Sequence, residues 1–476
     1  MTSSDICLLL PELILAGSAL LLLVWGAWQG RSNAVFNGAA ILALAAAAVA
    51  AILAPEGRGF SGGVVSDGLS TFAKVAIYAA SAVSIVLGDR WLARRGEAKF
   101  EFPVLIVLAA LGMGMMASAG DLISLYIGVE LHSLALYVLA AIRRDDAKGS
   151  EAGLKYFVLG SLSSGLLLYG ASLIYGFAGS THFDVIAQAV QGGAGVGVLF
   201  GLVFLICGLA FKVSAAPFHM WTPDVYEGAP SPIVGFFSAA PKLAAMVVLA
   251  RALDEGFAGA IGQWQQVIIV VALLSVFVGA FAGLAQRNLK RLWAYSSIAN
   301  IGYALIGLAS GGQDGVSAML MFMVLYMIDV TGFFACLCAL ERSGKPMETI
   351  DDMAGLFKER PVLALAMTAF ALSALGLPPF SGFFAKFFVF KAALGAGLAW
   401  VAVAALVGSV VAAFYYLRLI KVMWFDAAPE GEIAKAPVEA KTIAVGAALF
   451  SFPVVLVALY WLTPLAERAA AAFGGA

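Results

Sequence analysis

Long apolar segments recur along the whole chain and constrain its fold more than any other feature. A helix needs about 20 residues to cross a bilayer, because it rises about 1.5 Å per residue and the hydrocarbon core is about 30 Å thick. Hydrophobic residues make up 62% of the 476 positions and charged residues 12%, a composition suited to lipid. The sequence predicts an all-α polytopic membrane protein whose fourteen spans lie near residues 6–28, 34–54, 68–88, 101–119, 122–142, 153–178, 196–218, 231–251, 264–285, 292–310, 315–341, 361–396, 398–424 and 441–463.

The loops between these spans differ in charge from one side of the membrane to the other. One side carries most of the loop Lys and Arg residues, namely Arg31, Arg90, Arg94, Arg95, Lys99, Arg143, Arg144, Lys148, Arg287, Lys290, Arg291, Arg342, Lys345, Lys358, Arg360, Arg418, Lys421, Lys435 and Lys441. The other side carries only Arg58, Arg251 and Arg468. By the positive-inside rule the basic side is cytoplasmic, so both termini are expected outside. The first span follows no basic region or cleavage pattern and is expected to remain in the protein.

Two of the predicted spans are interrupted. A single helix over residues 361–396 would be about 54 Å long, far beyond the thickness of the bilayer core. Pro378 and Pro379 lie in its middle and remove two backbone donors. The seventh span meets Pro217 soon after Lys212. Broken helices at membrane depth often mark ion sites, because a polar cavity must satisfy the free backbone groups.

The seventh and twelfth spans are five apart, which predicts a duplicated five-helix unit. Because five is odd, the second copy would be inverted in the membrane. We expect four segments: an N-terminal three-helix segment over 1–100, a first five-helix repeat over 101–251, an inverted repeat over 264–424, and a C-terminal loop and helix over 425–476.

The basic residues inside the predicted spans are all lysines: Lys74, Lys155, Lys212, Lys242, Lys386 and Lys391. Arginine stays ionised under physiological conditions, whereas a desolvated lysine can release its proton. Lys212 precedes the seventh-span break, Lys242 follows Pro241, and Lys386 follows the double proline, all too deep for the side chain to reach an interface. We interpret these three as groups that change charge during function.

The remaining lysines are less deeply placed. Lys155 lies nearer the cytoplasmic end of its span, and its side chain either takes part in proton transfer or reaches the interface. For Lys74 and Lys391, which lie toward span ends, the interfacial interpretation is favoured.

Two carboxylates also fall inside predicted spans. Glu130 lies near the middle of span 122–142, where an isolated charge costs several kcal/mol. It is interpreted as a proton carrier or the partner of a buried lysine, with a purely structural ion pair as the alternative. Asp329 lies in the eleventh span and is either a second acidic relay residue or the partner of a lysine. His132 is interpreted as a packing residue.

Several classes of function are excluded by composition and spacing. A formal net charge of −1 provides no basic field for nucleic acid. Neither a metal-ligand cluster nor a catalytic triad is present in the sequence, so no cofactor or metal is expected in this chain. The chemistry predicted from the residues is therefore charge coupling, in which a nearby carboxylate holds the proton of a buried lysine and its removal releases that proton.

Three motifs resemble signatures of one family. Residues 217–230 read PFHMWTPDVYEGAP, residues 294–302 read AYSSIANIG, and residues 377–387 read LPPFSGFFAKF. They are similar to the antiporter-like membrane subunits of proton-pumping NADH:quinone oxidoreductase, respiratory complex I. The resemblance is closest to the subunit N branch. The WTPDVY motif and Lys386, where subunit M would carry glutamate, match that branch, and the long C-terminal lateral helix of subunit L is absent.

The resemblance implies functions for particular residues and partners. It implies a proton relay through Glu130, Lys155, Lys212, His219, Lys242 and Lys386. Flavin and iron–sulfur clusters would belong to partner subunits, and the quinone would bind elsewhere. The neighbours would be subunits K and M in the same bilayer. The expected location is a bacterial inner (plasma) membrane, with multiple spans and periplasmic termini.

Two other functions remain open at this stage. One is a subunit of a multisubunit cation/proton antiporter, which would not co-purify with flavin and iron–sulfur subunits. The other is a passive membrane scaffold, in which neutralising Glu130 would impair assembly but not the pumping of complexes that do form.

Overall fold

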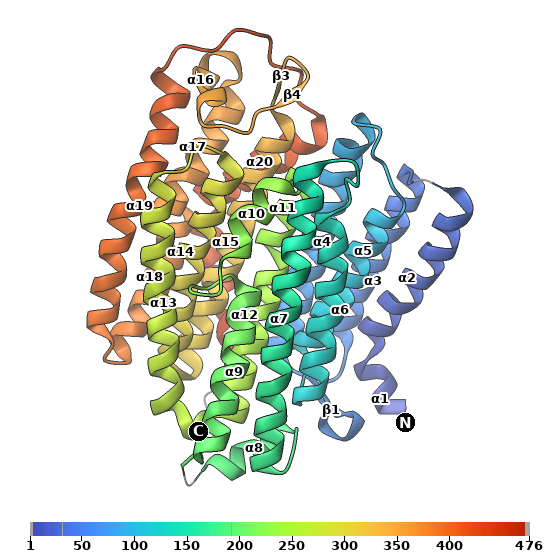
Figure 1. Ribbon diagram of the computed structural model, residues 1–476, viewed down its shortest axis with the longest axis vertical. Helices are drawn as coiled ribbons and strands as arrows, with labels where there is room; N and C mark the ends of the chain where they lie inside the picture. Colours follow the sequence, from blue (N-terminus) through green and yellow to red (C-terminus); the bar gives the residue numbers. More distant parts are fainter. Residues whose placement is uncertain (1–2, 31, 192, 472–476) are drawn as a thin grey trace.

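The computed structural model describes residues 3–30, 32–191 and 193–471 and consists of a bundle of long helices (Figure 1). Arg31, one of the basic loop residues named above, lies outside the described residues. In these ranges the β-structure is limited to two short hairpins, β1 (Gly57–Gly59) with β2 (Val64–Ser66) and β3 (Glu341–Arg342) with β4 (Lys345–Pro346). The fold is therefore all-α, as the apolar segments predict.

The helices follow the predicted spans closely. In chain order the helices are α1 (Ser3–Leu8), α2 (Leu10–Gln29), α3 (Ala34–Leu53), α4 (Gly68–Arg94), α5 (Glu101–Ala117), α6 (Leu122–Ala140), α7 (Ala147–Ala178), α8 (Phe183–Val190), α9 (Val196–Val213), α10 (Trp221–Gly228), α11 (Ser231–Ser238), α12 (Ala240–Arg251), α13 (Ile261–Leu284), α14 (Leu289–Ala309), α15 (Gly312–Ala339), α16 (Leu356–Glu359), α17 (Pro361–Leu375), α18 (Ser381–Gly395), α19 (Ala399–Phe425), α20 (Val438–Leu449) and α21 (Val455–Ala470). Within the described residues, twelve helical stretches are long and apolar enough to cross a membrane, and α5 and α17 are shorter apolar helices.

The predicted interruptions are present, and two more accompany them. The seventh span divides into α9 and α10, and the twelfth into α17 and α18. The eighth span, predicted as continuous, divides at Ala239, whose φ of −108° and ψ of −94° are not helical. Pro241 follows in the first turn of α12, where a missing N–H costs little. A π-helical turn over Phe450–Val454 interrupts the last span between α20 and α21.

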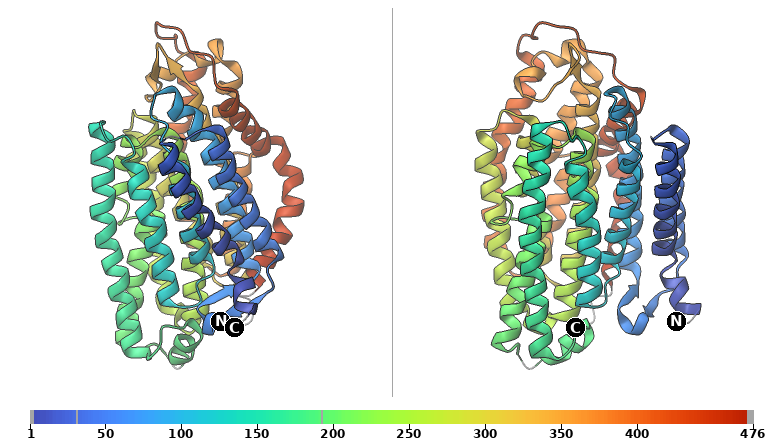
Figure 2. Two further views of the ribbon diagram at one scale, coloured as in Figure 1. Left: turned by 90° about the vertical axis from the view of Figure 1, so that its right-hand side faces the viewer. Right: turned by 45° about the vertical axis from the view of Figure 1, so that its right-hand side comes forward.

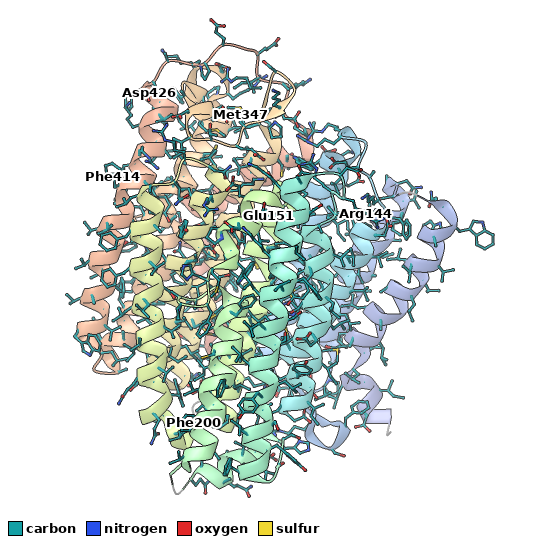
Figure 3. The ribbon with its side chains drawn as sticks, in the orientation of Figure 1. Arg144, Glu151, Phe200, Met347, Phe414 and Asp426 are labelled. Atoms are coloured by element: carbon teal, nitrogen blue, oxygen red, sulfur yellow. The ribbon has the colours of Figure 1, made fainter. Side chains whose placement is uncertain are left out.

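The two ends of the bundle differ in their loops. At one end lie β3, β4, α16 and the loop after α19, drawn at the top of Figure 1. We call this the basic end, since it carries the Lys- and Arg-rich loops. At the opposite end lie α1, α8, β1 and the end of α21, so both ends of the chain lie on the same side (Figures 1 and 2). In Figure 3, Arg144, Met347 and Asp426 mark the basic end, and Phe200 lies toward the opposite end.

The bundle has a buried centre and an apolar outer surface. Every residue of α11 and α12 is buried, which places Lys242 at the centre of the protein. By contrast, outward side chains such as Phe200, Val410 and Trp461 are more than half exposed, as expected where lipid is the solvent.

Two basic residues differ from their predicted positions. Lys74 does not reach an interface: its side chain is buried, and its Nζ lies 2.6 Å from Glu12 Oε1 on α2. Because the buried Glu12 carboxylate neutralises the Lys74 charge, the lysine side chain does not have to extend to the membrane surface. Arg251, predicted in a loop, is fully buried between Asp67, at 2.8 Å, and Glu255. Burial raises the pKa of Asp67, but the Arg251 charge and the hydrogen bonds from Arg251 and Ser70 together outweigh this and leave that pKa below its ordinary value.

Candidate functional site: a line of buried lysines

Glu130, Ser133 and Tyr137 share one face of α6. Their spacing of three and four residues brings side chains to the same side of a helix. Glu130 Oε1 is buried and has no hydrogen-bond partner among the described residues. Ser133 is fully enclosed and donates its hydroxyl to the carbonyl of Val129 at 2.6 Å. The result is a polar stripe along an otherwise apolar helix.

Lys212 faces this stripe from the end of α9. Its ammonium donates to Ser133 Oγ at 2.8 Å, to Tyr137 Oη at 3.3 Å and to Ser164 Oγ on α7 at 3.4 Å. Only 6% of Lys212 is exposed. The helix ends one residue later, and Ser214 takes a left-handed φ of 66°. Lys212 therefore lies beside the predicted break, held by hydroxyl groups and not by a direct ion pair within the described residues.

Lys242 occupies the centre of the bundle near the start of α12. Its ammonium donates to Ser297 Oγ on α14, and the same oxygen accepts a hydrogen bond from Tyr326 Oη on α15 at 2.7 Å. The ring of Tyr226 lies 5.6 Å from Lys242 Nζ, within the range of a cation–π contact. With 1% of its surface exposed, Lys242 is enclosed by neutral groups.

Lys386 binds the broken end of α17. Its ammonium donates to the carbonyls of Ala374 and Leu375, each at 3.0 Å, and to Ser409 Oγ on α19 at 2.8 Å. The last carbonyls of a helix have no partner within it, and they form the negative end of the helix dipole. The Lys386 ammonium is therefore stabilised at the end of α17. Gly376 is required beside it: its φ is +89°, and a Cβ would lie 2.9 Å from Lys386 Cδ.

Asp329 meets the other side of the same break. Its Oδ2 accepts hydrogen bonds from Ser373 Oγ at 2.5 Å and Ser381 Oγ at 2.7 Å. Ser381 is the first residue of α18, whose N-terminus favours a negative charge. Among the described residues no lysine lies within ion-pair distance of Asp329, so pairing with a lysine, one of its two alternative interpretations, is not found. Serine hydroxyls from the two half-helices bind Oδ2 instead, while the buried Oδ1 has no hydrogen-bond partner among the described residues.

A small cavity separates the Lys242 and Lys386 clusters. Its polar lining comes from Ser296 and Asn300 on α14, Tyr326 and Asp329 on α15, and Ser373 on α17. Polar walls of this kind can hydrogen-bond to water, which an apolar cavity cannot. Beyond Lys386, a second pocket lined by Gly376, Ser409 and Lys391 leads away from the break. Lys386 thus lies between two hollows.

Lys155 and His219 lie apart from this line. The Lys155 side chain is 41% exposed and pairs with Asp224 and Glu151, each at 2.7 Å. Asp224 also binds Arg291 at 2.6 Å, which forms a charged cluster toward the basic end. His219 lies in the break between α9 and α10, and its buried Nδ1 has no hydrogen-bond partner within the described chain. Lys391 is exposed on α18, consistent with the interfacial interpretation.

Sequence reasoning missed the groups that hold the lysines. The hydroxyls of Ser133, Ser297 and Ser409 accept hydrogen bonds from the three ammonium groups. Ser297 lies in the AYSSIANIG motif, but the sequence did not single out any of the three as a lysine partner. Serine is frequent at helix contacts in membranes for packing reasons alone, so its presence carries little signal. The Glu12 partner of Lys74 was also missed, although a carboxylate inside the first span is itself unusual.

Comparison with known proteins places the chain in a family. Residues 119–412 match the family described as NADH:quinone oxidoreductase/Mrp antiporter, TM. A relative from Caulobacter sp. (strain K31), NADH-quinone oxidoreductase subunit N, is 70% identical over all of this chain and 99% of its own length.

Solved structures agree with that placement. A chain of respiratory complex I from Thermus thermophilus is 33% identical, with a TM-score of 0.83 over 96% of this chain and 99% of the other. The Mrp complex from Dietzia sp. DQ12-45-1b shares the fold, with a TM-score of 0.86 over 100% and 98% of the two chains at 22% identity. The chain belongs to the antiporter-like membrane subunits of NADH-quinone oxidoreductase, the proton-translocating respiratory complex I, in the subunit N branch.

Proposed function

We propose that Glu130, Lys212, Lys242 and Lys386 form the proton route of this subunit, with redox energy supplied by other subunits of the complex. The observation that carries the proposal is the set of partners around the three lysines. Each ammonium is buried, and each is held by hydroxyl, carbonyl or aromatic groups without a direct carboxylate partner in the described chain. Neutral partners leave a buried lysine free to lose its proton, whereas a contacting carboxylate would fix it in the charged form.

Glu130 supplies the charge that this route needs. It lies on the same face of α6 as two of the Lys212 partners, Ser133 and Tyr137. A charged carboxylate near Lys212 favours the protonated lysine. If the carboxylate is neutralised or moves away, the lysine releases its proton more readily. Transfer from Lys212 toward Lys242 would follow. The polar cavity between the Lys242 and Lys386 clusters provides the next hydrogen-bonding surface.

Lys155 and His219 are proposed as accessory members of the route. Lys155 belongs to the charged cluster with Asp224 and Arg291 toward the basic end, where protons can be collected from water. His219 lies in the break that follows Lys212, and its unpartnered buried Nδ1 can accept or donate a proton. Both would supply or steer protons at the Lys212 end.

Two inverted five-helix repeats, over 101–251 and 264–424, are the proposed framework. In support, the two helix pairs that would be equivalent cross closely at glycines. A Cβ added to Gly112 of α5 would lie 2.5 Å from the backbone of α6, and one added to Gly279 of α13 would lie 2.4 Å from the backbone of α14. The segments 1–100 and 425–476 would flank the repeats, giving fourteen crossings in total.

The surroundings of the subunit follow from its family. We propose subunits K and M as its neighbours and a bacterial inner membrane as its location, with both termini periplasmic. The common position of α1 and the end of α21 opposite the basic end supports that orientation. Flavin and iron–sulfur clusters would reside in partner subunits, as the membership of this chain in the complex I membrane subunits suggests.

NADH-driven proton uptake by inverted membrane vesicles tests the route. Lys212→Ala and Lys386→Ala each remove a relay lysine, and pumping per assembled complex should fall to near background. Lys358→Ala is the control, because Lys358 is exposed at the basic end and lines neither cavity beside Lys386. Its pumping should equal that of the wild type.

Assembly must be measured in the same membranes. The NADH–ferricyanide reaction reports the amount of complex, and pumping is divided by that amount. Normal pumping by Lys212→Ala in fully assembled complexes would show that this subunit is a scaffold and not part of the route.

A further inference from the structure

An unassigned hollow lies at the basic end, between α17 and α20. Its lining residues are Glu359, Arg360, Pro361, Val362, Leu363, Lys435, Ala436, Val438, Lys441, Thr442, Val445, Gly446 and Leu449. The cavity measures about 780 Å³. We call it the α17–α20 groove. None of the buried lysines of the proposed proton route lines this groove.

The rim of the groove is positively charged. Lys435 and Lys441 are exposed, and neither forms an ion pair within the described residues. Arg360 stands beside them and holds the neighbouring loop by donating to the carbonyl of Ile433 at 2.7 Å. The one acidic side chain of the lining, Glu359, is already paired with Arg342 at 3.2 Å. The rim therefore carries uncompensated positive charge.

Two helices begin at this rim and add to its affinity for anions. α17 starts at Pro361 and α20 starts at Val438, so both N-terminal ends are directed toward the same opening. Helix N-termini carry partial positive charge and free N–H groups. The Thr442 hydroxyl offers a further donor. A phosphate group would find cations, amides and a hydroxyl in one place.

Below the rim the groove becomes apolar. Val362 and Leu363 of α17 face Val445 and Leu449 of α20 across it, and Gly446 has open space where a side chain would stand. From Lys441 to Leu449 the helix descends about 12 Å, the depth from a headgroup into the acyl chains. Val362, Leu449 and Val454 are about half exposed and continue the apolar surface outward.

We infer that the α17–α20 groove binds an anionic phospholipid, with its phosphate between Lys435, Lys441 and Arg360 and an acyl chain over Gly446. A basic rim above an apolar groove at one membrane interface matches the two halves of such a lipid. An acidic protein segment would neutralise the basic residues of the rim. It would not supply an apolar chain long enough to cover the lower half of the groove.

Photolabelling of the assembled complex tests this inference. The complex is purified, depleted of lipid and placed in phosphatidylcholine nanodiscs that contain phosphatidylglycerol with a photoactivatable acyl chain. Mass spectrometry then measures labelling of peptides from α17 and α20. The same probe on a phosphatidylcholine headgroup provides the comparison, and we expect the anionic probe to label the groove more strongly.

Two variants sharpen the test. Lys435→Ala with Lys441→Ala should lower anionic labelling by about 25-fold, since each cation near a lipid surface contributes about fivefold. Lys345→Ala with Lys358→Ala is the control, because those lysines are exposed at the same end but do not line the groove. Gly446→Leu should block acyl entry without touching the rim.

Three results would overturn the inference. They are equal labelling by the two headgroups, unchanged labelling in the Lys435 and Lys441 double variant, and cross-linking of a cysteine placed at Val445 to a neighbouring subunit in native membranes. NADH oxidation by each complex verifies its assembly. The surface lysines are not part of the proposed proton route, so loss of labelling can be separated from loss of pumping.

Discussion

Buried lysines occur in two kinds of surroundings in this protein. In the N-terminal three-helix segment, Lys74 lies 2.6 Å from Glu12, and both side chains are buried. In the rest of the bundle, Lys212, Lys242 and Lys386 are equally buried but bind serine hydroxyls and backbone carbonyls. A contacting carboxylate stabilises the charged lysine permanently, whereas neutral partners tolerate either state. The difference separates a lysine that holds helices together from lysines that can transfer protons.

The ion pair of the N-terminal segment should give the largest effect on stability. Glu12→Ala leaves Lys74 charged and unpaired in the bundle, which costs about 3–5 kcal/mol. We expect the yield of assembled complex to fall sharply, measured by native gel. The double variant Glu12→Leu with Lys74→Met should recover most of that yield. If Glu12→Ala assembled normally but stopped pumping, the distinction between holding and transferring lysines would fail.

Replacing a transferring lysine by arginine should give the next largest effect. Lys212→Arg and Lys386→Arg keep a cation but one that does not release its proton. Proton transfer through the subunit should fall by about 10²-fold or more, the scale of a lost acid–base group. Assembly should survive, because an arginine at 386 can still donate to the α17 carbonyls and one at 212 to the Ser133 hydroxyl. Vesicle pumping by the Lys386→Arg complex at the wild-type rate would contradict the assignment.

Neutralising Glu130 or Asp329 should slow pumping less than the lysine-to-arginine replacements do, and the two variants should differ from each other. Glu130→Gln removes a charge that acts on Lys212, worth about 1–2 kcal/mol or about tenfold in proton affinity. Asp329→Asn keeps an oxygen that accepts from Ser373 and Ser381, so its effect should be weaker. The pumping rates of the two variants, measured side by side, test this order. If pumping fell further in Asp329→Asn than in Glu130→Gln, the carboxylate that controls proton transfer would be Asp329, in the proposed second repeat.

Removing one hydroxyl should give the smallest effect. Tyr326→Phe deletes a donor to Ser297, the oxygen that also holds Lys242. A single hydrogen bond of this kind contributes about 0.5–1.5 kcal/mol. We expect a modest slowing of pumping with full assembly. Tyr415→Phe is a suitable control, because the Tyr415 hydroxyl is buried without a hydrogen-bond partner among the described residues.

Much of the fold could be predicted from the sequence because lipid restricts the backbone so strongly. Apolar length gave the helices, and Pro217, Pro378 and Pro379 marked two of the breaks. The break at Ala239 lies two residues before Pro241, which has no N–H to donate to the carbonyl of Phe237 as a continuous helix would require. A single proline was interpreted as part of a continuous span, so this break was not predicted, although it too has a local cause.

The candidate site was predictable only in part. Lysines inside apolar spans are conspicuous because they are costly, and Lys212, Lys242 and Lys386 are all buried as expected. Their partners come from distant helices: Ser297 is 55 positions from Lys242, and no spacing rule connects them. Arg251 was assigned to a loop because it follows the eighth apolar span, whereas Asp67 and Glu255 hold it inside the bundle. Tertiary contacts decide these positions.

The proton-to-electron ratio of reconstituted complexes carrying Lys242→Met tests the central claim most directly. Lys242 lies at the centre of the bundle, in contact with neutral partners only, and methionine fills a similar volume without a charge. A proton route through the buried lysines predicts a lower ratio, or electron transfer slowed together with pumping, in fully assembled complexes. A wild-type ratio at a wild-type rate of NADH oxidation would contradict it.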